Sequence, residues 1–466
     1  MEQLTPLNAI KYTILIVILN PIFQAHCQKN SDCTLLKTAD YQTPFCQNQY
    51  QQVLKFTPNV FNTQNQNVVR GQTLGGIIGI YRRIHNQDQI CYVSCGLRRL
   101  NGSPPDEYTM FELASVTKTF VGSVLGTLVY NKTVRPTDAV APYLPRNFVL
   151  TPNQSTVTFQ QLATYSGGVC FSNAPSVRIG SGNPKLNQAH FVMDINHLDP
   201  TQNRCPNGKP NVTSVYGTPL PTHNRYSNSS MGLLAQALMN YDSFPNALKG
   251  SFNGWICNNV TNPLAMNSTN ACMPREAKQG ICPANTAPRG TSCNTSSWSS
   301  AEYATGYHIK NGQYQKGRPF PFIPWAGGGS LRSNASDMIK FIRANLGVSI
   351  NNNPKQLALI QGMQIAHNPA SFLPAPPGNA LQPIIGSQPP LRGRQGYAWV
   401  CQRFNKNRIC GKIGGHGNFR SFVGISQNKQ YGVIILFNTG MLSNKKSPVQ
   451  VARPSEIGVN LIKNAP

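Results

Sequence analysis

Apolar residues along this chain follow two different spacings, and the spacing changes with position. Runs rich in Ile, Val and Tyr at residues 76–81 and 90–94 flank a polar segment, 86–89, which predicts a hairpin of two strands. Similar runs predict further strands toward the C-terminal end, at residues 397–400, 419–425 and 431–437.

Helical spacing dominates between these ends. The clearest example starts in the stretch FELASVTKTF at residues 111–120, and apolar residues three and four positions apart continue to residue 129. Further helices are predicted at residues 156–162, 229–241, 334–346 and 454–463. Strands toward both ends with helices between them predict an α+β fold, in which the two ends of the chain pair in one sheet.

The N-terminal segment has a character of its own. An apolar run at residues 12–23 follows Lys11 and is interrupted by Asn20-Pro21. Because a bilayer span needs about 20 apolar residues, this shorter run favours a cleaved secretory signal peptide over residues 1–27. An uncleaved membrane anchor is the alternative.

The remainder divides by composition. Residues 28–65 are polar and contain cysteines, which indicates an N-terminal extension, and residues 66–466 form the main predicted domain. Within that domain, residues 170–225 are rich in Asn, Pro, Gly and Ser, and residues 243–300 are rich in cysteine. Structureless loops of such length are unusual, so we expect two insertions with local order near these positions.

Cysteine usage agrees with secretion. Thirteen cysteines occur, and the twelve after residue 27 are an even number, suited to disulfides in an oxidising compartment. Cys401 and Cys410 flank a turn-like Asn-Lys-Asn and are expected to close a hairpin; the other pairings stay open. Asn-x-Ser/Thr sequons further indicate a secreted glycoprotein. No Cys-x-x-Cys occurs and the histidines are scattered, so no metal is expected.

The chain is strongly basic. It carries 41 Lys and Arg against 15 Asp and Glu, a formal net charge of +26, although only 12% of residues are charged. Such an imbalance attracts acidic polymers such as anionic polysaccharides. There is no dense Lys/Arg run and no interleaved basic and aromatic stripe, so nucleic acid is not an expected partner.

Candidate chemistry begins with Ser115 and Lys118, at the start of the clearest helical pattern. Residues three apart share a helix face, so the Lys118 amine can reach the Ser115 hydroxyl. A serine hydroxyl is a poor nucleophile by itself, and a desolvated amine beside it can take its proton. The tetrad alone has little specificity, because Ser-x-x-Lys also occurs at residues 426–429 and 443–446.

Two later motifs supply matching groups. Tyr226 precedes a helix, and nearby ammonium groups should lower the pKa of its phenol, so that it serves as a base or proton shuttle. Asn228 can donate to a substrate carbonyl and orient the lysine amine. Lys412, expected at the start of a strand, supplies positive charge, and Gly414 and Gly415 let substrate lie along the strand edge.

Backbone N–H groups of Ser115 and Gly415 would complete the site as an oxyanion hole. Taken singly, these residues have ordinary alternatives: a rim tyrosine, a glycosylated turn and a surface cation. Their order along the chain favours the catalytic interpretation.

Together these motifs resemble those of class C β-lactamases and related serine hydrolases, which include D-amino-acid peptidases and family VIII esterases. Residues 111–120 resemble the family's nucleophile box, and RYSNSSMGL at residues 225–233 resembles its Tyr-Ala-Asn-Ser box. LATYSGG at residues 162–168 matches another recurrent stretch, and the similarity spans residues 70–440 apart from the insertions. The resemblance implies an antiparallel sheet flanked by helices, a mostly helical subdomain and no cofactor.

The resemblance also implies roles. Ser115 would be the acylated nucleophile, with Lys118 and Tyr226 transferring the proton. Asn228 would position substrate, and Lys412 would be the lysine of the third motif. The implied reaction is acyl transfer from a small-molecule or peptide substrate through a covalent acyl-enzyme, with water as the final acceptor.

Three features complicate the family pattern. Ile413 stands where β-lactamases usually carry Thr, and the loss of that hydroxyl favours an ester or peptide over a β-lactam. His416 permits a second register, in which it replaces Lys412 in the third motif. Asn228 lies in a sequon, and we expect it to be unmodified because a glycan there would block the pocket.

The leading hypothesis is therefore a secreted serine hydrolase that cleaves an ester or amide. A true β-lactamase or D-Ala peptidase is the close alternative. A catalytically inactive binding protein on the same fold is the third, although binding alone does not require all of Ser115, Lys118, Tyr226 and Asn228.

Overall fold

The computed structural model describes residues 32–144, 156–167, 226–241, 252–271, 303–317, 326–351, 353–368, 394–404, 406–440 and 451–466. The predicted signal peptide, the first insertion and most of the second lie outside these residues. Within the described ranges, no helix combines the length and apolar character that crossing a membrane requires.

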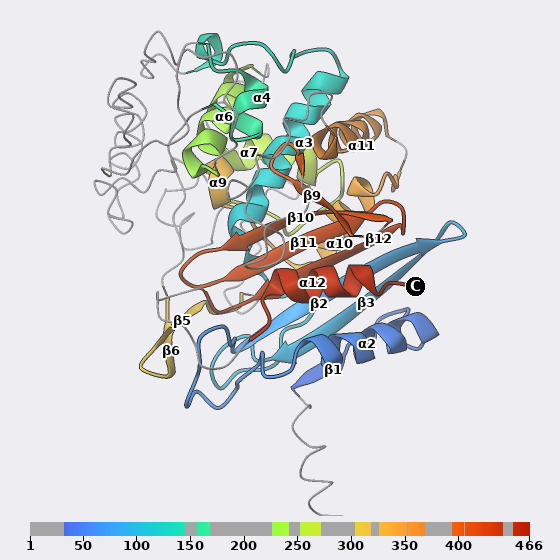
Figure 1. Cartoon of the computed structure of the whole chain (residues 1–466), viewed down its shortest axis with the longest axis vertical. Helices are drawn as coiled ribbons and strands as arrows, with labels where there is room; N and C mark the ends of the chain where they lie inside the picture. Colours follow the sequence, from blue (N-terminus) through green and yellow to red (C-terminus); the bar gives the residue numbers. More distant parts are fainter. Residues whose placement is uncertain are drawn as a thin grey trace, which may run out of the picture.

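An antiparallel sheet of eight strands forms the centre of the fold, in the order β1-β3-β2-β12-β11-β10-β9-β8 (Figure 1). Its strands are β1 (Cys33–Leu35), β2 (Gly75–Ile84), β3 (Gln87–Gly96), β8 (Arg394–Gln395), β9 (Val400–Phe404), β10 (Asn407–Gly415), β11 (Arg420–Ser426) and β12 (Tyr431–Phe437). Strands β2 and β12 pair directly, with Ile78 opposite Ile435. The prediction that the two ends of the chain pair is therefore confirmed.

Helices cover both faces of this sheet (Figure 1). α2 (Pro44–Phe56) and α12 (Pro454–Lys463) lie on one face, and α3 (Thr117–Tyr130), α10 (Ala335–Asn345) and α11 (Pro354–His367) lie on the other. Strands β11 and β12 are buried at every position, because alternate side chains enter the apolar cluster on one face or the other. The antiparallel sheet flanked by helices is as predicted.

A second group of helices lies on the α3 side of the sheet (Figure 1). The helices α4 (Phe159–Ala163), α6 (Asn228–Tyr241), α7 (Phe252–Ile256) and α9 (Ala326–Gly329) form the helical part of the molecule (Figure 1). Two small ribbons, β4 (Phe111–Glu112) with β7 (Arg332–Ser333) and β5 (Tyr307–Lys310) with β6 (Gln313–Lys316), complete the described elements that concern the site. The helices predicted at 229–241, 334–346 and 454–463 are thus confirmed to within a residue at each end.

Three local predictions differ from the structure. The turn between β2 and β3 consists of His85 and Asn86 alone, with φ angles of 47° and 62°, so the strands extend through the polar residues expected to form it. Residues 397–399 precede β9 instead of forming a strand, because Ala398 has a φ of 65°. Lys412 lies near the end of β10, not at the start of a strand.

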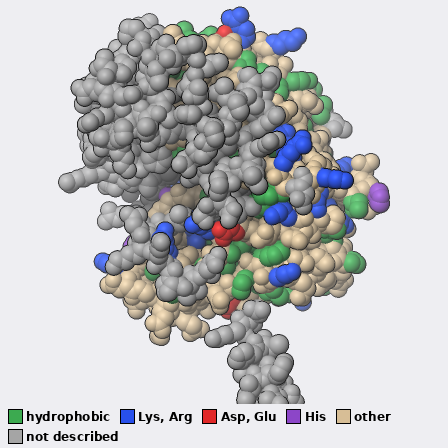
Figure 2. Space-filling view, in the orientation of Figure 1, with side chains coloured by type: hydrophobic (Ala, Val, Ile, Leu, Met, Phe, Trp, Pro, Cys, Tyr) green, Lys and Arg blue, Asp and Glu red, His purple; other side chains and the backbone are tan. Residues whose placement is uncertain are grey.

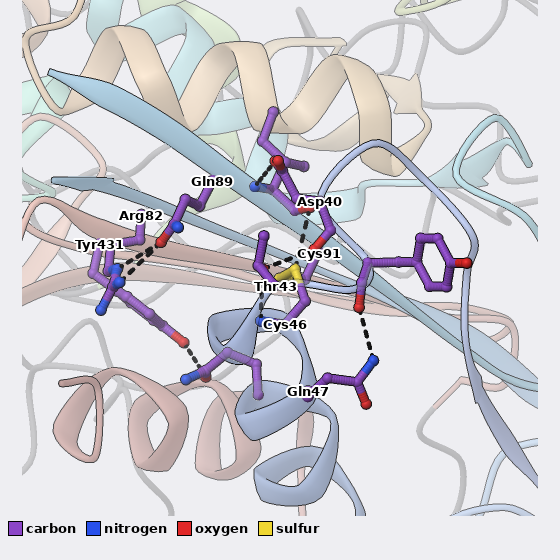
Figure 3. Close-up of a disulfide and its surroundings, with 11 residues drawn as sticks. Asp40, Thr43, Cys46, Gln47, Arg82, Gln89, Cys91 and Tyr431 are labelled. Atoms are coloured by element: carbon purple, nitrogen blue, oxygen red, sulfur yellow. Dashed lines mark hydrogen bonds between the residues drawn. A yellow bond between two sulfur atoms is a disulfide. The ribbon is translucent and has the colours of Figure 1, made fainter.

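Residues 28–65 include elements that join the sheet. β1 pairs with β3 and forms one edge of the sheet, and disulfides link Cys33 to Cys95 and Cys46 to Cys91. Figure 3 shows the second of these, where α2 meets the sheet and the Asp40 carboxylate accepts a hydrogen bond from the backbone of β3 at 2.8 Å. At the opposite side of the sheet, the predicted Cys401–Cys410 disulfide joins β9 and β10 and is confirmed.

Candidate active site

Ser115 lies at the junction of a strand and a helix. It occupies a turn of 3-10 helix, Ala114–Val116, between β4 and α3. The preceding Ala114 has a φ of 46°, a strained conformation for a residue with a side chain. The Leu113 N–H donates to the carbonyl of Leu331 at 2.8 Å, continuing the β4–β7 ribbon and fixing the backbone just before the serine.

Lys118 lies in the first turn of α3 and is fully buried. Its Nζ is 3.0 Å from Ser115 Oγ and 2.7 Å from Asn228 Oδ1, and it also donates to the carbonyl of Gly328 in α9. Desolvation lowers the pKa of the Lys118 amine well below 10.5, and the charge of Lys412 lowers it further. The fold therefore favours a neutral amine beside the serine hydroxyl.

Tyr226 approaches the same hydroxyl from the start of α6. Its Oη lies 2.5 Å from Ser115 Oγ and donates to Asn228 Oδ1 at 3.2 Å. The expected lowering of the phenol pKa is wrong: burial raises it above 10.0, and the hydrogen bond with Ser115 offsets this only in part. Tyr226 consequently keeps its proton at neutral pH, and it can pass protons as a hydroxyl and not as a phenolate.

Lys412 reaches the site from β10. Its Nζ lies 4.5 Å from the ring centroid of Tyr226 and 5.8 Å from that of Tyr165, so the ammonium faces two aromatic rings. Burial lowers the pKa of Lys412 to about 7. The site thus holds two lysines whose ammonium forms are destabilised by the loss of water.

The end of β10 lies directly against the nucleophile segment. A Cβ atom at Gly414 would lie 2.1 Å from Ser421 Oγ, 2.2 Å from the Leu113 carbonyl oxygen and 3.3 Å from the Ser115 nitrogen. Only glycine allows this approach. Gly415 follows at the exposed end of the strand, opposite Arg420 of β11.

His416 takes a different direction from Lys412. Its Nε2 lies 2.6 Å from Oε2 of Glu112, and its Nδ1 accepts a hydrogen bond from the Asn418 N–H at 3.2 Å. The imidazole is therefore engaged with the carboxylate, while the Lys412 amine lies over the Tyr226 ring, as does that of Lys118 at 4.9 Å.

The other described Ser-x-x-Lys tetrad forms no comparable site. Ser426 ends β11, and Lys429 donates to the backbone carbonyl of Ala465 near the C-terminus. The tetrad at residues 443–446 lies outside the described residues.

Sequence reasoning missed Tyr165, Glu112 and Arg332. They lie within or beside the stretches 162–168, 111–120 and 334–346, but their residue types alone indicated no role in the site. Tyr165 has a φ of 61°, and the two charged residues face one another across the β4–β7 ribbon. A glutamate placed three residues before a candidate nucleophile was the one available signal.

With this geometry established, comparison with known proteins defines the class. The Beta-lactamase family model matches residues 65–447, which is most of the chain. The chain belongs to the β-lactamase family and is a serine hydrolase of that family, as predicted.

Solved structures give the same fold. A β-lactamase/D-alanine carboxypeptidase from Pseudomonas syringae is similar with a TM-score of 0.58 and 18% identity, over 90% of this chain and 98% of that one. A class C β-lactamase from Rhodobacter sphaeroides has a TM-score of 0.56 and 17% identity, over 84% and 94%. A D-alanine carboxypeptidase AmpC from Burkholderia cenocepacia has a TM-score of 0.57 and 16% identity, over 90% and 99%. Among curated proteins, none is similar enough in sequence to count as a match.

Proposed function

We propose that this protein is a secreted serine hydrolase that cleaves an ester or amide through an acyl-enzyme on Ser115. The observation that carries the proposal is the buried Lys118 amine 3.0 Å from Ser115 Oγ, with its pKa well below the ordinary value. An amine whose neutral form is favoured in this way can accept the hydroxyl proton. Burying a lysine amine in this way costs free energy, which favours a chemical role for the residue.

The proposed acylation starts when Ser115 Oγ attacks the substrate carbonyl carbon and transfers its proton to Lys118 Nζ. Negative charge develops on the carbonyl oxygen, and the N–H groups of Ser115 and Gly415 stabilise it. The bond to the leaving group then breaks. The Tyr226 hydroxyl, 2.5 Å from Oγ, relays the proton from the lysine to the departing alcohol or amine.

Deacylation would follow the same path in reverse. A water molecule gives a proton to the Lys118 amine through the Tyr226 hydroxyl and attacks the acyl carbon, and Ser115 regains its proton as the acid leaves. Asn228 holds both proton carriers, because its Oδ1 accepts from Lys118 at 2.7 Å and from Tyr226 at 3.2 Å.

The third motif bears on the substrate. Isoleucine at position 413 has no hydroxyl, and its side chain packs against the apolar cluster on the α12 face of the sheet. This favours an ester or amide without a β-lactam carboxylate. The second candidate, a β-lactamase or D-Ala peptidase, is supported by the similar solved structures, which include a class C β-lactamase and a D-alanine carboxypeptidase.

Secretion is better supported than an acidic-polymer partner. Secretion agrees with the Cys33–Cys95, Cys46–Cys91 and Cys401–Cys410 disulfides. An acidic-polymer partner gains no support from the family or the similar structures. Figure 2 shows Lys and Arg side chains spread over the described part of one face, with few acidic side chains between them.

Covalent labelling tests the proposal. A fluorophosphonate or a penicillin probe should label folded protein, and Ser115→Ala should abolish the label. Ser426→Ala is the matched control, because this buried serine of the second tetrad has no hydrogen-bond partner for its Oγ among the described residues. Failure of both probes on folded protein would leave the binding-protein alternative.

Two further measurements refine the assignment. A hydrolysis screen of short acyl esters, D-amino-acid amides and a chromogenic cephalosporin separates the substrate classes. Mass spectrometry of the peptide that contains Asn228 should find it without a glycan, and a glycan there would contradict the assignment of the site.

A further inference from the structure

A second buried polar contact lies beside the nucleophile. The side chains of Glu112 and His416 are only 8% and 5% exposed, and Oε2 lies 2.6 Å from Nε2. None of the proton-transfer steps proposed above uses either side chain. A charged group held this deep in the fold needs a compensating role or partner.

The positions of the two residues along the chain suggest that role. Glu112 lies three residues before Ser115, and His416 directly follows Gly415. The contact therefore joins the two backbone segments that carry the proposed oxyanion-hole N–H groups. The carboxylate is anchored to the nucleophile segment, and the imidazole to the end of β10.

The carboxylate is held from its own side of the contact. Arg332 faces Glu112 across the β4–β7 ribbon, with one guanidinium nitrogen 3.7 Å from Oε1. The same guanidinium donates to the carbonyl of Ala271 at 3.1 Å. Glu112 is consequently fixed by the ribbon, and not by the histidine alone.

The imidazole is also oriented independently. Because Nδ1 of His416 accepts a hydrogen bond from the Asn418 N–H, this nitrogen carries no proton. Nε2, the atom that faces Glu112, is therefore the nitrogen that can donate. The Phe419 ring packs against the imidazole at a centroid distance of 5.7 Å.

The turn that contains His416 is also packed from another direction, because a Cβ atom at Gly440 would lie 2.1 Å from the carbonyl oxygen of Gly417. The His416 N–H donates to the carbonyl of Phe419 at 3.1 Å, which closes the turn between β10 and β11. A Cβ atom at the following Gly417 would meet nothing within 4 Å among the described residues. The contact with Glu112 thus restrains the side of this turn that faces the nucleophile segment.

We propose that Glu112 and His416 are positioning residues that hold the Gly415 N–H in register with the Ser115 N–H. Oxyanion donors act only within a few tenths of an ångström of their target position, so a small shift of the turn weakens transition-state stabilisation. This inference rests on the proposed acylation of Ser115, since it concerns the same oxyanion. Substrate affinity should depend on it much less than the rate of acylation.

The test uses His416→Ala, which leaves the Glu112–Arg332 pair in place. We expect the rate constant for fluorophosphonate labelling to fall by about 10- to 100-fold. For an ester found in the hydrolysis screen, kcat should fall by a similar factor while KM changes less than about threefold. His416→Gln should recover most of the rate, because its amide N–H can donate to the carboxylate.

Controls separate positioning from folding and from the proposed function. Gly417→Ala, in the same turn, should label at the wild-type rate, and circular dichroism and thermal melts give the folded fraction of each variant. Wild-type rates in folded His416→Ala, or an unrescued loss in His416→Gln, would overturn the inference alone. Wild-type protein that no probe labels would instead overturn the proposed function.

Discussion

The two sides of the candidate site hold their chemical groups in different ways. On the helical side, Ser115, Lys118, Tyr226 and Asn228 form a continuous hydrogen-bonded network between α3 and α6. On the strand side, β10 presents a lysine over aromatic rings and a glycine backbone pressed against the nucleophile segment. The helical side is therefore built to move protons, and the strand side to place charge and backbone donors.

This difference determines how substitutions on each side should reduce catalysis. A hydrogen-bonded network loses function when one atom in the proton path is removed. A backbone surface loses function when its position changes, even if no reacting atom is removed. Substitutions on the two sides should accordingly differ in size and in which kinetic parameter they change.

The largest effect is expected on the helical side. Lys118→Met removes the proposed base but keeps the volume of the side chain, so labelling by a fluorophosphonate should slow by about 10³-fold. Lys429→Met, in the second tetrad, should label at the wild-type rate because its amine contacts the C-terminal backbone instead. Stopped-flow or quench labelling measures both rates, and equal rates for the two variants would contradict the assignment of the base.

A smaller loss is expected from moving the strand side. In Gly414→Ala the new Cβ would lie 2.1 Å from Ser421 Oγ and 2.2 Å from the Leu113 carbonyl oxygen, so β10 or residues 113–115 must shift. We expect the labelling rate to fall by about 10²-fold, because a shift near 1 Å has that cost for a positioned reaction. Gly417→Ala is the control, and similar rates for the two alanine variants would show that the close approach is unimportant.

The helical side could be predicted from the sequence because its spacing is local. Ser115 and Lys118 share one helix turn, and the apolar residues that follow predict that helix directly. The start of α6 was also predictable, because Asn228 directly precedes a regular apolar pattern. In each case the residues that carry the chemistry lie at the beginning of a strongly periodic segment.

The sequence identified candidate residues of the strand side but did not predict what surrounds them. The position of Lys412 at the end of β10 depends on how β9, β10 and β11 align, which a local pattern does not specify. On the helical side, the pKa of Tyr226 was predicted in the wrong direction, because burial outweighs the nearby cations and burial follows from the whole fold. The contact of Glu112 with His416 joins residues about 300 positions apart, and no spacing rule anticipates it.

Substitution of Lys412 should have an intermediate effect, which appears in the pH dependence of the labelling rate. The charge of Lys412 lowers the pKa of the Lys118 amine, so Lys412→Met should raise that pKa. The acid limb of the labelling rate, where the Lys118 amine loses its proton, should then move to higher pH. Lys412→Arg keeps the charge and should leave the limb nearer its original position; identical limbs in all three proteins would show that the two sides are electrostatically independent.

The same substitution should also change stability with a defined sign. The folded pKa of Lys412, about 7, is below its ordinary value of 10.5, so the unfolded chain binds more protons between these values. The cost of burying the charge is full below pH 7 and disappears as the pH rises toward 10.5. Lys412→Met should thus stabilise the fold by on the order of a few kcal/mol at pH 6, and much less at pH 10, in denaturant unfolding. A gain that does not depend on pH would mean that the methionine acts through packing and not through charge.

The smallest effect on catalysis is expected from the disulfide on the strand side. Cys401 and Cys410 are direct partners across β9 and β10, two positions before Lys412 in the latter strand. Their replacement by alanine removes the tether but leaves the pairing of β10 with β11, which holds Gly414 opposite Ser421. Because the loop is short, we expect a loss of roughly 2–3 kcal/mol of unfolding free energy, with the labelling rate of folded protein within about twofold of wild type. If the rate falls as far as in Gly414→Ala, the β9–β10 hairpin and not β11 positions β10. The strand side of the site then extends further across the sheet than its contacts with the nucleophile indicate.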